Sequence, residues 1–298
     1  MCNSITTQVC GGLGNQMFQY AFGRSLALQH STPLFLDLTW FENITNGTDR
    51  KFALEYFPYL QSGQGPWSAC PENHRIAITY RPFWYKVFEK LGLKVRRCIR
   101  EKTPMKFQQI KFPLPAYFEG YWQDEKYFYP FATQIRKDFT FPTLPEPAAL
   151  VAEDIGRHKN AVSLHIRRGD YASNPDVQNV HGLCSPQYYQ NAIMYLKKYV
   201  GDLASLKIYL FSDDPLWVQE NFDTYGVPSH VIDLHTEADA HHDMHLMSLC
   251  THHIIANSSF SWWGAWLGER GRVIAPQRWF ASQEMQQYSP VPERWLKL

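Results

Sequence analysis

The sequence predicts an α/β protein of two Rossmann-like lobes with parallel sheets, and its length and N-terminal segment favour this class first. The chain has 298 residues, which corresponds to roughly two domains of about 150 residues each. Residues 6–10 form a predicted strand, residues 17–30 a predicted apolar helix, and residues 33–37 a second strand. This order is typical of a βαβ unit, whose two strands lie parallel in one sheet.

The second lobe begins after a proline-rich stretch at residues 139–150, FTFPTLPEPAAL. Closely spaced prolines favour extended backbone, so we place the boundary here, between lobes at 1–145 and 146–298. Beyond it, short apolar runs alternate with helical stretches, which indicates a second parallel sheet. The predicted strands of this lobe are residues 161–166, 207–212, 253–256 and 272–275. Two such lobes imply a cleft.

Composition and charge argue against several kinds of partner. Lys plus Arg number 29 against 28 for Asp plus Glu, so no broad basic field favours a nucleic acid or a membrane surface. The N-terminus lacks the pattern of a signal peptide, and no apolar run approaches about 18 residues. The six cysteines are scattered, with no Cys-x-x-Cys pair. This usage predicts reduced thiols in a cytoplasmic protein.

Two segments of the N-terminal lobe carry weaker signals. Residues 38–68 predict loops and short elements, because aromatic and polar residues mix there with glycine and proline. Residues 81–100 predict an amphipathic helix with a basic end at 94–100. A helix packed on a sheet explains this pattern. Contact of the basic end with a membrane or an acidic glycan is the alternative.

Three predicted strands of the C-terminal lobe end in polar clusters, at residues 167–171, 213–214 and 257–259. Ligands of open α/β sheets bind beyond the carboxyl ends of the strands, so we expect these clusters to form one pocket wall. Arg167 and the arginine after it can bind a phosphate bidentately and cancel charge on a departing diphosphate. The structural alternative is a surface salt bridge from this pair to Asp170.

The remaining clusters also have functional and structural interpretations. Ser258 and Ser259 open a predicted helix, where hydroxyls suit a cap or a phosphate, and the tryptophans at 262–266 have the spacing of a helix core. His241 and His245 have the i, i+4 spacing of metal ligands, but no His-Glu-x-x-His pattern accompanies them. The carboxylates at 213–214 suit either Mg²⁺ or a helix cap. We expect no metal.

A glycine-rich loop, GGLGNQ at residues 11–16, joins the first predicted strand to the first predicted helix. Backbone N–H groups without side-chain bulk can approach an oxyanion at such a helix start, and a diphosphate would fit there. The loop lacks the Lys-Ser/Thr of a P-loop and the third glycine of a dinucleotide fingerprint. A tight turn without any ligand, with a positive φ at Gly14, is the structural alternative.

Several separate motifs together resemble one known family. They are GGLGNQMFQYA, EGYWQDEKYF, HIRRGDY, FSDD and SSFSWWGAWL, and they span residues 11 to 267. In this combination the chain is similar to the inverting α-1,2-fucosyltransferases of the bacterial type. Residues 38–118 and the C-terminal end carry the least resemblance.

The resemblance implies a GT-B architecture in which the second lobe holds GDP-fucose, the first lobe holds the acceptor, and no metal ion or other cofactor is required. By the same likeness the glycine loop reaches the donor diphosphate, Arg167 binds its β-phosphate, and His165 and Asp243 recognise the guanosine. The residues expected to bind the donor are Gly12, Gly14, Asn15, His165, Arg167, Asp243, Ser258, Ser259 and Phe260.

The catalytic base is not fixed by the resemblance. Asp170 and Asp176 are the candidates, with Asp37 behind them, because an attacking hydroxyl must lose a proton to a nearby group. A purely orienting role for Asp170 towards Arg167 stays open, as does a homo-oligomeric state. The expected reaction is transfer of L-fucose to the 2-hydroxyl of a terminal β-galactoside. Another acceptor, another deoxysugar, or an inactive glycan-binding module are the alternatives.

Overall fold

The computed structural model divides the chain into two compact units, Met1–Pro142 and Thr143–Leu298. The division falls inside the predicted linker at 139–150. The structure describes residues 3–42, 50–79, 97–102, 107–169, 175–234, 239–268, 270–285 and 287–298, without the side chains of 77–78 and 175–177. The roles expected for the two units stay predictions.

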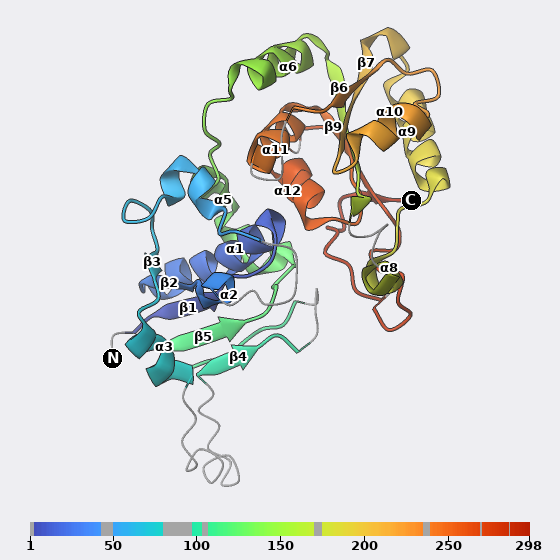
Figure 1. Ribbon diagram of the computed structural model, residues 1–298. Helices are drawn as coiled ribbons and strands as arrows, with labels where there is room; N and C mark the ends of the chain where they lie inside the picture. The colour runs from blue at the N-terminus through green and yellow to red at the C-terminus, as the bar shows by residue number, and fades with distance from the viewer. Residues whose placement is uncertain are drawn as a thin grey trace. The chain divides into compact units, whose positions relative to one another are not determined.

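The first unit is built on a parallel sheet with strand order β3-β2-β1-β5-β4 (Figure 1). Its strands are β1 (Ile5–Gln8), β2 (Leu34–Asp37), β3 (Ser68–Ala69), β4 (Cys98–Arg100) and β5 (Ala116–Glu119). Its helices are α1 (Leu13–His30), α2 (Thr39–Glu42), α3 (Glu72–Thr79) and α5 (Ala132–Asp138), with the 3₁₀ turns η1 (Leu54–Tyr56), η2 (Pro58–Leu60), η3 (Glu125–Tyr127) and η4 (Tyr129–Phe131). The predicted βαβ unit is confirmed, because β1 and β2 pair in parallel and α1 connects them.

The second unit is built on a parallel sheet with strand order β11-β10-β9-β6-β7-β8. Its strands are β6 (Asn160–Ile166), β7 (Leu206–Ser212), β8 (Ser229–Ile232), β9 (His252–Ile254), β10 (Val273–Ala275) and β11 (Leu296–Lys297). Its helices are α6 (Glu146–Arg157), α8 (Pro175–His181), α9 (Pro186–Val200), α10 (Pro215–Asn221), α11 (Ala240–Leu249) and α12 (Ser259–Gly268), with the 3₁₀ turn η5 (Leu203–Ser205). The four strands predicted for this lobe are all present, and the α/β class with two Rossmann-like units is confirmed.

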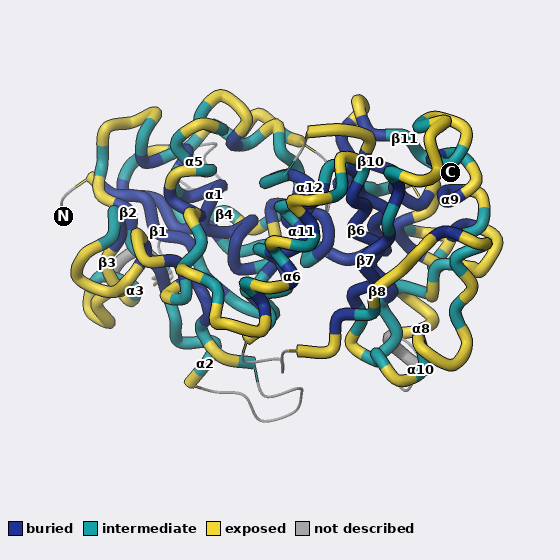
Figure 2. Tube along the Cα trace, turned by 90° about the horizontal axis from the view of Figure 1, so that it is seen from above, coloured by how far each residue is buried: buried dark blue, intermediate teal, exposed yellow. Residues whose placement is uncertain are grey.

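The second sheet buries a hydrophobic core on each face, because side chains alternate along its central strands. Val162, Leu164 and Ile166 of β6 pack on the face that α9 and α10 cover. Ala161 lies on the opposite face, with the apolar side chains of α6 and α11. Figure 2 shows the resulting band of buried residues along β6 and β7. Both faces being covered explains why these strands are continuous apolar runs in the sequence.

One sequence prediction in the first unit needs a correction. The amphipathic helix expected at residues 81–100 lies largely outside the described residues, but its C-terminal end does not. Cys98–Arg100 forms strand β4, and Arg100 Nε lies 2.6 Å from Glu119 Oε2 on β5. The last basic residue therefore belongs to the sheet. None of the helices in the described ranges combines the length and the apolar character that crossing a bilayer requires.

Candidate active site

The path of the chain across the second sheet reverses between β6 and β9. From β6 the chain passes to β7 and β8 on one side, and then returns to β9 on the other. The carboxyl ends of β6 and β9 therefore flank a topological switch point, which is where open α/β sheets bind ligands. Residues 167–169 and 257–259 follow these strands closely, and residues 213–214 follow the neighbouring β7. The three polar clusters thus lie at one edge of the sheet, as predicted.

Arg167 follows β6 and is held by Asp213, which follows β7. The two strands pair with Ile166 opposite Ser212, so Arg167 and Asp213 leave the sheet side by side. Arg167 Nη1 lies 2.9 Å from Asp213 Oδ2, and 23% of the arginine side chain stays exposed. The carboxylate orients a guanidinium that still faces solvent and can bind an anion. The partner expected from the sequence, Asp170, lies outside the described residues.

Gly169 lets the Asp213 carboxylate approach the backbone. A Cβ at residue 169 would overlap Asp213 Oδ2, and Asp213 Oδ1 accepts a 2.8 Å hydrogen bond from the backbone N–H of Arg168. This close approach therefore requires glycine at residue 169. The sequence placed Asp213 on the same predicted pocket wall as Arg167 but did not predict that the two side chains pair. Its place directly after a strand that neighbours β6 is the signal that could have found it.

Arg168 has a different environment from Arg167. Its Nε lies 3.2 Å from Asp214 Oδ2, and its guanidinium lies 3.7 Å from the centre of the Trp217 ring. Asp214 also accepts a 3.3 Å hydrogen bond from the backbone N–H of Trp217 and so caps α10. The capping interpretation is therefore confirmed for Asp214. In the described part of the chain, no three His, Cys, Asp or Glu side chains are arranged to hold a metal ion.

His165 lies on the face of the sheet that α12 covers. The residue is 4% exposed, and the centroid of its ring lies 5.8 Å from that of the Phe260 ring. Burial, with a smaller contribution from the positive charge of Arg167, lowers the pKa of His165 to about 3. The imidazole is therefore neutral near pH 7. Its Nδ1 has no hydrogen-bond partner among the described residues, so this buried atom can serve a ligand.

The start of α12 lies on the other side of the switch point. Ser258 Oγ accepts a 3.3 Å hydrogen bond from the backbone N–H of Phe260, so this hydroxyl caps the helix. Ser259 is the first helical residue, and the positive end of the helix dipole therefore lies at the edge where Arg167 lies. Asp243 lies in the first turn of α11, which packs against α12.

Other residues near this edge are structural. Trp262, Trp263 and Trp266 are fully buried, so the core interpretation of these tryptophans is confirmed. Away from this edge, at the amino end of β9, His252 accepts a 2.9 Å hydrogen bond at Nδ1 from the backbone N–H of Arg272. In the third cluster, Asn257 Nδ2 donates to backbone carbonyls of neighbouring loops. The Asn257 amide therefore has a structural role, because it holds these loops together.

The glycine loop has its left-handed residue at Gly11, where φ is +76°. Gly14 is instead buried inside α1, so a positive φ at Gly14 is wrong. Gly12 has an ordinary φ of −77°, and a Cβ there would meet nothing within 4 Å. Asn15 is one of the residues expected to bind the donor. Its Oδ1 accepts a 2.7 Å hydrogen bond from Gln123 Nε2.

Two glutamine side chains hold this loop in place at the switch point of the first sheet, between β1 and β5. Gln16 Nε2 donates to the carbonyl of Gly11 at 2.9 Å, and its Oε1 accepts from the N–H of Ala53 at 2.8 Å. Gln19 Nε2 donates to the carbonyl of Gly120, after β5, at 3.1 Å. The polar residues of the GGLGNQMFQ motif therefore shape the loop from within.

Of the three candidate bases, the structure describes the side chain of Asp37 alone. Asp170 lies outside the described residues, and so does the side chain of Asp176, whose backbone belongs to α8. Asp37 is 2% exposed. Its Oδ2 accepts from Tyr117 Oη at 2.6 Å, and its Oδ1 accepts from the backbone N–H and the hydroxyl of Thr39. Asp37 thus acts as a structural acceptor at the end of β2.

Comparison with known proteins identifies the class. The model of glycosyl transferase family 11 matches residues 83–298. An α-1,2-colitosyltransferase of Escherichia coli is 36% identical over 99% of this chain and 98% of its own length. The O-antigen biosynthesis glycosyltransferase WbnK, also of Escherichia coli, is 31% identical over 97% of this chain and 98% of its own length.

Among solved structures, POFUT1 in complex with GDP is similar with a TM-score of 0.49 and 12% identity, over 92% of this chain and 98% of that one. The fucosyltransferase NodZ from Bradyrhizobium has a TM-score of 0.46 and 14% identity, over 89% of this chain and 92% of that one. By family and relatives this protein is a glycosyltransferase. It belongs to glycosyl transferase family 11.

Proposed function

We propose that this glycosyltransferase moves L-fucose from GDP-β-L-fucose to the 2-hydroxyl of a terminal β-galactoside, forming an α-1,2 linkage with inversion. The observation that carries the proposal is the arrangement at the β6/β9 edge. The β6/β9 edge is the edge of the second sheet at the carboxyl ends of β6 and β9. The partly exposed guanidinium of Arg167 lies there, oriented by Asp213, and α12 begins beside it. A diphosphate needs such donors, and the family membership supplies the sugar-transfer chemistry.

Breaking the bond between a sugar and a diphosphate builds negative charge on the leaving oxygen. Arg167 and the N–H groups at the start of α12 can stabilise that charge in the transition state. The neutral His165 can hydrogen-bond the nucleoside without adding a second positive charge. The acceptor hydroxyl attacks the anomeric carbon from the face opposite the diphosphate and passes its proton to a base. Asp170 and Asp176 remain the proposed bases.

A 3,6-dideoxy donor sugar is the second candidate, because one relative is an α-1,2-colitosyltransferase. Colitose is L-fucose without the 3-hydroxyl group. Both donors share the diphosphate and the 6-methyl group, so the features at the β6/β9 edge suit either. Competition between GDP-fucose and GDP-colitose for one galactoside acceptor, with both products quantified by mass spectrometry, decides between the two donors.

The proposed reaction is tested by incubating the protein with GDP-fucose and a panel of galactosides, and by determining the linkage of each product by NMR. We expect an α-1,2-linked fucose on terminal β-galactosides. Products on other sugars only, or an unchanged acceptor, would contradict the proposal. We also expect activity to persist in excess EDTA. Full loss with EDTA, restored by Mg²⁺ or Mn²⁺, would contradict metal independence.

A further inference from the structure

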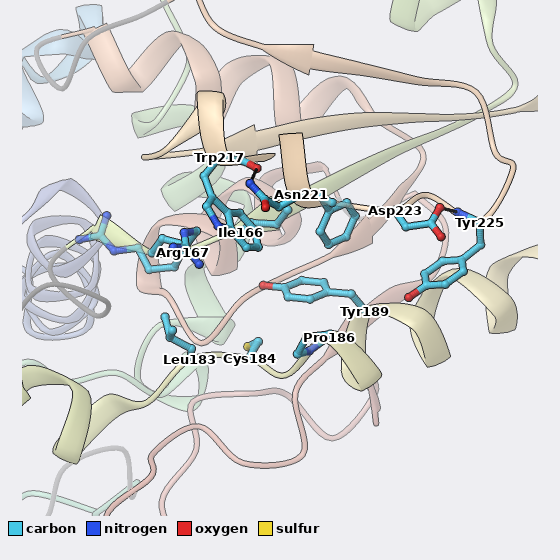
Figure 3. Close-up of a pocket in the computed structure, with 12 residues that line it drawn as sticks. Ile166, Arg167, Leu183, Cys184, Pro186, Tyr189, Trp217, Asn221, Asp223 and Tyr225 are labelled. Carbon is cyan, nitrogen blue, oxygen red and sulfur yellow. Dashed lines mark hydrogen bonds between the residues drawn. The ribbon is translucent and has the colours of Figure 1, made fainter. Parts of the chain in front are cut away.

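A cavity of about 140 Å³ lies in the second unit, and Arg167 and Arg168 line it. In Figure 3, Arg167 lies at one end of the cavity, and Asp223 and Tyr225 lie at the other. Between them the wall is largely apolar and aromatic. The residues that form this wall are Ile166, Leu183, Tyr189, Trp217, Phe222 and Tyr225. The HIRRGDY motif contributes Ile166, Arg167 and Arg168 to the lining, but no sequence motif pointed to the aromatic part of the wall.

The cavity lies on the opposite face of the sheet from His165. Side chains alternate along β6, so His165 faces Phe260 and α12, whereas Ile166 faces Tyr189 of α9. Arg167 follows at the edge between the two faces. A nucleoside diphosphate sugar has three parts in a row. With the nucleoside near His165 and the diphosphate at Arg167, the sugar extends to the cavity.

The chemistry of the wall favours a sugar with few hydroxyl groups on one side. Tyr189 Oη already donates to the carbonyl of His165 at 3.1 Å, and the Arg168 guanidinium stacks on the Trp217 ring. These contacts leave carbon surface towards the cavity, against which a methyl group packs better than a hydroxymethyl group. Cavities of roughly this size hold one six-membered ring such as benzene. A second nucleoside would be too large.

We propose that this cavity, called here the sugar pocket, binds the sugar of the GDP-sugar donor and packs its C6 methyl group against the apolar wall. The proposal rests on the proposed function, since it assumes a GDP-linked 6-deoxy sugar at Arg167. It adds the residues that distinguish a 6-deoxy sugar from its 6-hydroxy counterpart. Leu183 is the most useful of them, because it lies in the connection before α9, outside any helix or strand, and is 38% exposed.

The test compares GDP, GDP-L-fucose and GDP-L-galactose, which differs from GDP-L-fucose only by a hydroxyl on C6. Each is titrated calorimetrically into the wild type, Leu183→Trp, which fills the pocket, and Leu183→Ala, which widens it. Leu203→Trp is the matched control, because Leu203 is a similarly exposed leucine of η5, before the amino end of β7, and does not line the pocket. All four proteins are first checked for an unchanged melting temperature.

We expect the wild type and Leu203→Trp to bind GDP-fucose about tenfold more tightly than GDP-L-galactose. Leu183→Trp should bind GDP as the wild type does, but lose roughly tenfold or more in affinity for GDP-fucose. Leu183→Ala should keep GDP binding and lose the preference for the methyl group. Equal losses for GDP and GDP-fucose in Leu183→Trp would overturn the sugar pocket.

An unchanged affinity for both nucleotides in Leu183→Trp, with a raised KM for the galactoside, would also overturn the proposal, because the pocket would then belong to the acceptor. Failure of the wild type to bind GDP at all would overturn the proposed function itself. GDP contains no sugar from the donor, so its binding separates these two failures.

Discussion

Arg167 and Asp213 meet because the last residues of β6 and β7 lie opposite each other in the sheet. The carboxylate stabilises one orientation of a long side chain that has many rotamers. It also accepts the N–H of Arg168, so a single aspartate fixes both the backbone and the side chain that follow β6.

Arg167→Ala should lower turnover by roughly 10² to 10⁴, because a charge-assisted contact to the leaving diphosphate is lost. The fold should survive, since a good part of this side chain is exposed. Arg157→Ala on α6 is the matched control, because Arg157 is 72% exposed and forms only a helical surface pair with Glu153. Steady-state kinetics on both variants check this. If Arg167→Ala keeps more than about a tenth of wild-type turnover, a loss of only ~1.4 kcal/mol, Arg167 does not have this role.

Gly169→Ala should displace Asp213, because the new Cβ overlaps its carboxylate. Arg167 would lose its orientation, and a misplacement of about 1 Å can cost about 10²-fold in rate. Gly156→Ala is the control, because a Cβ at Gly156 of α6 meets nothing within 4 Å and should raise stability by about 0.5–1 kcal/mol. Turnover and melting temperature are measured for both. Wild-type turnover in Gly169→Ala would show that the Arg167–Asp213 geometry is not needed.

Among the elements, the glycine loop before α1 is best tested at Gly12, because Gly14 is buried inside the helix. Gly12→Ala places its Cβ in open space on a backbone of ordinary φ, so the melting temperature should not change. If the loop contacts the donor diphosphate, GDP affinity should fall roughly tenfold, because the Cβ holds the phosphate away from the N–H groups. Gly11→Ala is the contrasting variant, since its positive φ predicts a lower melting temperature. Unchanged GDP affinity in Gly12→Ala would remove the loop from the donor site.

The elements of the second unit were the most predictable from the sequence, for a physical reason. β6 and β7 are covered on both faces, so each appears in the sequence as a short continuous apolar run, which is typical of a buried parallel strand. β8 was missed because its first two residues are exposed at the edge of the sheet. α1 begins at Leu13, before the predicted Met17. Glycine propensity argued against helix there, and the side-chain hydrogen bonds of Gln16 override it.

At the scale of the whole molecule, two buried neutral histidines make the second unit sensitive to acid. Burial lowers the pKa values of His165 and His253 to about 3, below the ordinary value of about 6.5. The unfolded chain therefore binds more protons than the native protein between these values. Stability is complete above about pH 6.5 and is lost as the pH falls, on the order of 1 kcal/mol per unit and histidine.

Urea denaturation at several values between pH 7 and pH 5 measures this loss. His253→Asn should flatten the pH dependence of the unfolding free energy, because it removes one of the two groups. His230→Asn, at an exposed position on β8, is the matched control for the change of a histidine to asparagine. An equal slope in all three proteins would contradict the assignment of the acid sensitivity to His253.

The sequence motifs predicted where in the fold the site lies, but they did not predict which side chains contact each other there. The three polar clusters after β6, β7 and β9 were predicted to share an edge, because parallel strands end together. The pairing of Arg167 with Asp213 could not be predicted, because it depends on the register of β6 and β7. The sugar pocket was missed for a similar reason, since its walls come from segments distant in sequence.

The central claim is that Arg167 binds the β-phosphate of a guanosine diphosphate sugar at the β6/β9 edge. Calorimetric titration of GDP and GMP into the wild type and Arg167→Ala tests it directly, because the two nucleotides differ only in that phosphate. We predict that the wild type prefers GDP over GMP by roughly tenfold to 10²-fold, as a charge-assisted contact implies. Arg167→Ala should bind both nucleotides with the affinity that the wild type has for GMP. A preference for GDP that survives in Arg167→Ala would contradict the account.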